Sequence, residues 1–129
     1  MIDQELVTRK LTLVAQDLRR LEDLVAKGAE RYVERMIGRM IDVNYHVLTE
    51  SGQAPPPDYF ESFLALARLG VLEPAFARRL APSAGLRNRI VHEYDAIDPG
   101  RVFDAIQLAL EDVPAYVPAV QRFLGAPPQ

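Results

Sequence analysis

Apolar side chains recur along this chain with the spacing of α-helices, and no segment alternates with the period of a β-strand. The clearest stripe lies in residues 3–27, where apolar positions follow one another in steps of four and three residues. Polar residues, Asp17 among them, fall elsewhere around this predicted helix, which is expected to end at Gly28. The chain is therefore predicted to be all-α. The stripe consists of Val7, Leu11, Val14, Leu18, Leu21 and Val25.

Caps and breakers mark the boundaries of five more predicted helices. Asp58, Ser83 and Asp98 are the predicted N-caps, each followed by a helical pattern. Phe60 and Phe63 are predicted to lie on the buried face of one of these helices. The helices are expected over about residues 30–51, 58–69, 72–80, 84–93 and from 99 onward.

The last predicted helix contains Pro114 and Pro118, which are expected to kink or split it. The simplest arrangement is an up-down bundle of four to five main helices. We expect one domain over residues 1–124 and a flexible tail over 125–129.

Composition narrows the possible functions. The 129 residues include no cysteine, so there is no disulfide, thiolate nucleophile or cysteine-built metal site. The apolar stretches are too short for a membrane span, and the acidic N-terminus is unlike a signal peptide, so a cytoplasmic protein is expected. Common phosphate-loop, serine-hydrolase and zinc-protease motifs are missing, and we predict no cofactor. His46 and Glu50, one helical turn apart, are interpreted as a surface pair rather than metal ligands, so no metal is expected.

Charge is distributed unevenly. The whole chain has a net charge of −3, but residues 62–92 carry +4 and the remainder −7. A local cationic patch can bind phosphate even on an acidic protein, although a solvated arginine-rich face gives the same pattern. The cationic residues of this segment are Arg68, Arg78, Arg79, Arg87 and Arg89, and its one acid is Glu73.

Residues 86–95 bring together side chains suited to RNA cleavage: Arg87, Asn88, His92 and Tyr94. Arginine presents a fork of donors that matches a phosphate, and histidine exchanges protons near neutral pH. Metal-free cleavage needs a base for the ribose 2′-OH and a cation for the charge that grows on the phosphate oxygens. Asparagine could orient the substrate or the histidine.

Helix geometry complicates this interpretation. Positions 87 and 92 point about 140° apart on an ideal helix. The two side chains converge only if the helix end distorts or if a second copy of the chain contributes, which favours a site at a symmetric dimer interface. The alternative is an amphipathic helix with a polar end, where His92 interacts favourably with the helix dipole.

Residues 87–94 read R-N-R-I-V-H-E-Y, and they resemble the R-x4-H-x-Y motif of the HEPN superfamily. The similarity is to its HepT-like branch of bacterial and archaeal toxins, and it extends from about residue 32 to residue 106. Further points of resemblance are Asp42, the proline-bearing turn before Tyr59, Gly70-Val71-Leu72 and Tyr94-Asp95.

The resemblance implies a HEPN-like helical bundle, a homodimer, and a toxin that is a metal-independent endoribonuclease. It makes Arg87 and His92 the catalytic pair and Asn88 and Asp42 supporting residues near the cleft. It also implies a partner, a minimal nucleotidyltransferase antitoxin (MntA-like) that transfers AMP from ATP onto Tyr94. The phosphate of the added AMP, two residues from His92, would repel RNA, and the bulk of the AMP group would fill the path of the RNA.

We assign RNA contacts to Arg78, Arg79 and Arg89 of the cationic segment. Two alternatives stay open. One is a non-catalytic helical module that binds a nucleotidyltransferase and presents its substrate, because a fold does not dictate a function. The other is a helical dimer with a structural role alone.

Overall fold

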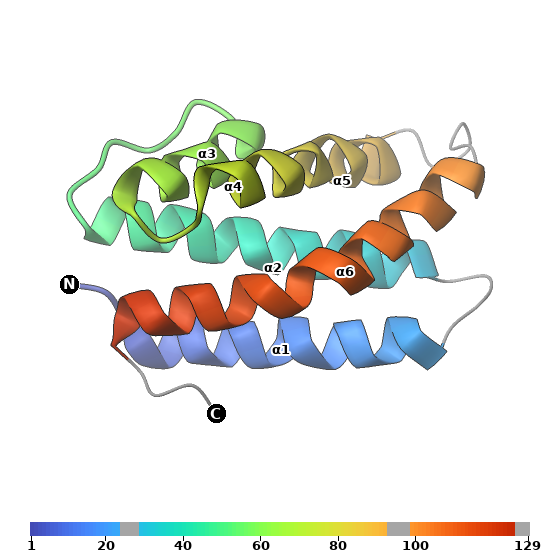
Figure 1. Ribbon diagram of the computed structural model, residues 1–129, viewed down its shortest axis with the longest axis horizontal. Coiled ribbons are helices and arrows are strands. Elements are labelled where there is room, and N and C mark those ends of the chain that lie inside the picture. Colours follow the sequence, from blue (N-terminus) through green and yellow to red (C-terminus); the bar gives the residue numbers. More distant parts are fainter. Residues whose placement is uncertain (24–28, 93–98, 126–129) are drawn as a thin grey trace.

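The computed structural model describes residues 1–23, 29–92 and 99–125, with side chains not described at 20–23, 29–30, 89–92, 99–106 and 108–110. Six α-helices and no strands occur in these ranges, which confirms the predicted all-α fold (Figure 1). The helices are α1 (Gln4–Asp23), α2 (Ala29–Glu50), α3 (Tyr59–Leu69), α4 (Pro74–Leu80), α5 (Pro82–His92) and α6 (Pro99–Leu124).

The helices form an up-down bundle. Figure 1 shows α1 and α2 running antiparallel and α6 returning across α1. Helices α3 and α5 pack on α2, and α4 packs against α3. The start of α1 and the end of α6 are adjacent, since Gln4 Nε2 donates a hydrogen bond to the Leu124 carbonyl at 3.2 Å. No helix in the described part of the chain is long and apolar enough to cross a membrane.

The described part of the predicted apolar stripe of the first helix faces the core, while the Leu21 side chain and Val25 lie outside the described residues. Val7, Leu11 and Val14 are at most 2% exposed and pack in one hydrophobic cluster with residues of α2, α3 and α6. Burial of these side chains stabilises the bundle, with each fully buried aliphatic side chain contributing about 1.5–3 kcal/mol.

A polar network crosses this core. The Tyr116 hydroxyl donates to Asn44 Oδ1 at 2.6 Å and lies 3.1 Å from the Met40 carbonyl oxygen. Asn44 Nδ2 donates to Ser62 Oγ at 3.1 Å, and Ser62 Oγ donates to the Tyr59 carbonyl at 2.6 Å. Asn44 and Ser62 are buried, so the network joins α2, α3 and α6 through groups that satisfy one another.

The Tyr116→Phe substitution is expected to lower the free energy of unfolding by about 1–2 kcal/mol, because Asn44 Oδ1 loses its donor while buried. Urea denaturation measures the loss. The matched control is Tyr45→Phe, which removes a hydroxyl bonded to the Pro56 carbonyl on the partly exposed connector. Equal losses in the two variants would contradict a special role of the buried network.

Asp17 lies off the apolar stripe in sequence, yet it is only 2% exposed. It accepts hydrogen bonds from Arg35 Nη2 at 2.9 Å and from Arg39 Nη1 at 2.6 Å, and the Asp17 hydrogen bond raises the pKa of Arg35. A buried carboxylate is compatible with the fold only when it is paired in this way. The group ties α1 to α2.

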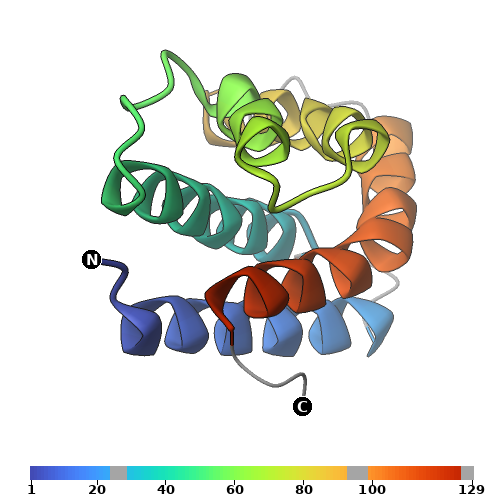
Figure 2. The same ribbon diagram turned by 60° about the vertical axis from the view of Figure 1, so that its left-hand side comes forward.

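Three local predictions needed correction. The prediction that Ser83 caps a helix is wrong, because α5 begins at Pro82, directly after Ala81 in the αR conformation. Phe60 is 43% exposed rather than buried. Of the two outcomes expected at Pro114 and Pro118, the split is wrong, because α6 remains one helix; the helix is instead bent along its length (Figure 2). Asp58 does cap α3, since its side chain accepts from Glu61 N at 2.8 Å.

Candidate active site

Residues 87–92 of the predicted motif lie on α5, which packs against α2 and α3. Arg87 is half-buried, whereas Asn88 is exposed. The Arg87 guanidinium lies over Gly38 of α2: the point that a Cβ would occupy there is 3.6 Å from Nε and 4.0 Å from Nη2. Nε itself is buried and has no hydrogen-bond partner within the described residues. The arginine is therefore held against the bundle.

An aromatic ring forms another side of this arginine's environment. The guanidinium carbon of Arg87 lies 5.5 Å from the centroid of Tyr59, a distance typical of a cation–π contact. The edge of Tyr45 meets Tyr59 with centroids 5.9 Å apart and rings at 90°. Tyr45 in turn donates its hydroxyl hydrogen to the Pro56 carbonyl at 3.1 Å. Burial, followed by the nearby Tyr59 and Asp58, raises the pKa of Tyr45, which keeps this donor protonated.

The supporting residues are placed differently. Asn88 is exposed beside Arg87, where it can meet a ligand. Asp42 is also exposed, and its carboxylate accepts from Lys10 Nζ of α1 at 3.1 Å. Gly38 and Asp42 are one turn apart on α2 and so share a face. The structure thus shows Asp42 paired with α1, and its supporting role stays a prediction.

The predicted RNA-binding arginines are only partly described. Arg78 is exposed. Arg79 has its guanidinium over Phe76 at 5.2 Å, and its Nε lies 3.6 Å from Asp112 Oδ1. The side chain of Arg89 lies outside the described residues.

Beyond Asn88, the structure describes the motif only as backbone, and only as far as His92. The side chain of His92 and the whole of Tyr94 lie outside the described residues. The backbone remains helical through His92, the last residue of α5. Position 92 is therefore about 140° around the helix axis from position 87, as in a regular helix. The structure shows no distortion of α5 that brings the two positions together.

His46 and Glu50, the pair one helical turn apart on α2, both contact the first residues of the chain. His46 Nε2 accepts a hydrogen bond from the Asp3 amide at 3.0 Å, and Glu50 pairs with the amino group of Met1 at 2.8 Å. That amino group lowers the pKa of Glu50. Among the described side chains, no cluster of three or more His, Asp or Glu residues could hold a metal ion.

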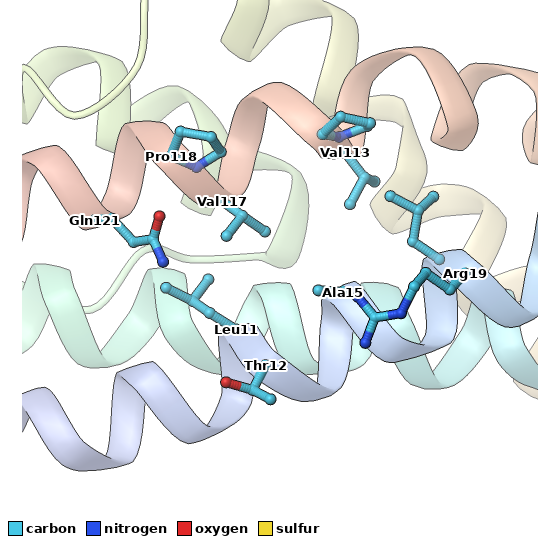
Figure 3. Close-up of a pocket in the computed structure, with 10 residues that line it drawn as sticks. Leu11, Thr12, Ala15, Arg19, Val113, Val117, Pro118 and Gln121 are labelled. Atoms are coloured by element: carbon cyan, nitrogen blue, oxygen red, sulfur yellow. The ribbon is translucent and has the colours of Figure 1, made fainter. Parts of the chain in front are cut away.

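A shallow groove lies elsewhere, between α1 and α6 (Figure 3). Its lining is mainly apolar, with Leu11, Val113 and Val117 among the lining residues and Arg19 as the one charged residue among those described. It contains no residue of the predicted site, so it is unrelated to the environment of Arg87 on α5.

Comparison with known proteins decides the family. A family model for the HepT-like ribonucleases matches residues 4–120. The chain belongs to the HepT-like ribonuclease family. A curated relative is the tRNA nuclease HepT of Aphanizomenon flos-aquae (strain 2012/KM1/D3), which is 42% identical over 95 residues. The matched region is 74% of this chain and 65% of that protein, so it spans slightly less than two thirds of the relative.

Solved structures share the HepT-like fold. The tri-AMPylated HEPN toxin of Shewanella oneidensis, in complex with an MNT antitoxin, aligns with a TM-score of 0.81 at 20% identity, covering 95% of this chain and 99% of that one. The cytosolic protein YutE of Bacillus subtilis aligns with a TM-score of 0.88 at 14% identity, covering 99% and 96%. At these identities the likeness shows the fold, and it confirms the predicted HEPN-like bundle.

The sequence pattern did not identify two residues around Arg87. Gly38 lies inside the helix predicted over residues 30–51, and a glycine inside a helix costs about 1 kcal/mol relative to alanine, which was an available signal for a close approach. Tyr59 follows the proline-rich connector, and nothing local distinguishes it from Phe60.

Proposed function

We propose that this HepT-like chain is the toxin of a toxin–antitoxin pair, an endoribonuclease that cleaves RNA without a metal through Arg87 and His92. The observation that carries the proposal is the environment of Arg87 on α5, where its guanidinium lies beside Gly38 and Tyr59. Membership of the family and the 42% identity to a tRNA nuclease support the same activity.

The proposed reaction divides the work between two side chains. The His92 imidazole takes the proton of a ribose 2′-OH, and the 2′-oxygen forms a bond to phosphorus. The bond from phosphorus to the 5′-oxygen breaks, and that oxygen leaves with the proton that the His92 imidazolium gives up, which restores the neutral imidazole. Arg87 pairs with the phosphate oxygens as their negative charge grows. Asn88 orients the substrate, and the cationic residues Arg78, Arg79 and Arg89 bind neighbouring phosphates.

The proposed active unit is a homodimer. Because α5 remains helical to its last residue, positions 87 and 92 of one chain diverge by about 140°. Two copies related by a twofold axis can place Arg87 of one chain opposite His92 of the other. Asp42 would then lie near the shared cleft. Cytoplasmic RNA is the proposed substrate.

Cleavage of RNA by the purified chain tests this function. We expect cleavage of a tRNA mixture to continue in EDTA, and the products to carry 2′,3′-cyclic phosphate and 5′-hydroxyl ends, because the nucleophile is the neighbouring 2′-oxygen. End labelling of the fragments identifies these termini. Products with 5′-phosphate ends, or activity that EDTA abolishes, would contradict the proposed chemistry. Intact RNA under all conditions would favour the non-catalytic module.

We also propose that a minimal nucleotidyltransferase antitoxin inactivates the chain by AMPylation of Tyr94. The AMPylated toxin of Shewanella oneidensis, in complex with its MNT antitoxin, supports this regulation. After co-expression with the cognate nucleotidyltransferase, intact-mass spectrometry should show added AMP in the wild type and none in Tyr94→Phe. Tyr59→Phe is the matched control and should retain the addition. AMP that persists in Tyr94→Phe would place the modification elsewhere.

A further inference from the structure

We infer that Gly38 and Tyr59 are positioning residues that hold Arg87 in the conformation in which it meets the scissile phosphate. The inference rests on the proposed function, because it concerns the arginine of that site. Neither residue touches the substrate in this account. Each acts through the guanidinium of Arg87, from two different helices of the bundle.

Gly38 provides the space. It lies inside α2, and the position of its absent Cβ is 3.6 Å from Arg87 Nε. An alanine methyl group would make an ordinary van der Waals contact there, but any longer side chain would extend into the volume of the guanidinium. The helix surface at residue 38 is thus shaped for a side chain from α5 to lie across it.

Tyr59 provides a fixed surface. Its ring lies 5.5 Å from the Arg87 guanidinium carbon, and the edge-on contact with Tyr45 limits its movement. Its backbone is fixed as well, because Ser62 Oγ donates to the Tyr59 carbonyl and is itself bonded to buried Asn44. Arg87 therefore lies against an element that the core network holds in place.

The nitrogens of Arg87 differ in whether they can reach a substrate. Nε is buried, while the residue as a whole remains partly exposed. Burial of Nε against α2 leaves the two Nη nitrogens as the donors for a phosphate. A positively charged fork held in place before the substrate arrives costs no reorganisation during the reaction.

The kinetics of RNA cleavage by two variants test the inference. Tyr59→Leu and Gly38→Leu are expected to lower kcat by about 10-fold or more with a much smaller change in KM, because the arginine is displaced rather than removed. Tyr59→Phe keeps the aromatic ring, so this variant should cleave RNA at the wild-type rate. The matched control is Phe60→Leu, which changes the next, exposed aromatic residue of α3 and should leave the rate unchanged. Gly38→Leu should keep the helical fold, as circular dichroism can show, since leucine favours helix more than glycine does.

A double-substitution experiment separates positioning from a general structural effect. In the Arg87→Lys background, Tyr59→Leu should cause little further loss, because the residue acts through the guanidinium that is no longer present. A full additional 10-fold loss in that background would overturn the inference.

Arginine side-chain NMR tests the positioning without any cleavage assay. The Arg87 Nε–Hε group should be rigid in the wild-type heteronuclear NOE and mobile in Tyr59→Leu and Gly38→Leu. If the wild type cleaves no RNA but shows this difference, the proposed function fails and the positioning stands. An Arg87 Nε–Hε group that stays rigid in both variants, or is already mobile in the wild type, would overturn the positioning.

Discussion

Replacing His92 by alanine is expected to lower the rate of RNA cleavage by about 10²–10⁴-fold, the contribution typical of a general base or acid. Growth arrest on expression of the chain should disappear with it. Position 92 is the last residue of α5, and the buried side chains in the described part of the chain come mainly from the other helices, so we expect the variant to keep its fold. Cleavage kinetics and circular dichroism measure the two effects.

The chain offers a matched control for this substitution. It has two histidines, and the other, His46, lies on α2 and accepts a hydrogen bond from the Asp3 amide. His46→Ala should leave the cleavage rate close to that of the wild type. A His92→Ala variant that cleaves as fast as His46→Ala would remove the histidine from the mechanism.

The second large effect is expected at Arg87. Arg87→Lys keeps the positive charge but loses the planar fork and the contact over Tyr59, so we expect cleavage to fall by about 10²-fold. Lysine also lacks the guanidinium that lies against Gly38. The loss should appear in kcat, measured under single-turnover conditions with saturating enzyme.

Arg68→Lys is the control for the arginine. Arg68 is exposed on α3, where its Nη2 lies 3.6 Å from Glu61 Oε2, and surface ion pairs of this kind contribute little. We expect its cleavage rate to match the wild type. If Arg87→Lys were equally harmless, a point charge would suffice and the fork geometry would have no role.

Features that depend on local sequence were predictable. The apolar stripes correctly indicated the helices, Asp58 marked the start of α3, and Gly70 marked its end in the left-handed conformation, with φ of 91°. In each case the residues that determine the feature lie within a few positions of it in the sequence.

Features that depend on tertiary packing were not predictable. Asp17 is buried because Arg35 and Arg39, on the next helix, neutralise it. The exposure of Phe60 follows from how α3 lies on the bundle, since its neighbour along the chain contacts Arg87 instead. Nothing in a helical period specifies which residues of another helix come within contact.

The candidate site also combines features that the local sequence predicts with features that depend on tertiary packing. The motif identified Arg87, and the structure supplies what a motif cannot, namely the surfaces of α2 and α3 that hold this side chain. The predicted divergence of positions 87 and 92 also agrees with the structure, because α5 is helical to its end. The proposal that a second copy of the chain completes the site rests on that geometry.

Mixing the two inactive variants tests most directly whether Arg87 and His92 act together across two chains. Arg87→Ala and His92→Ala are purified separately, mixed under conditions that exchange subunits, and assayed on RNA. In a mixed dimer one of the two sites regains both native residues, so cleavage should return to about a quarter of the wild-type rate. A mixture in which mixed dimers form but cleavage stays as low as in either variant alone would contradict the shared site.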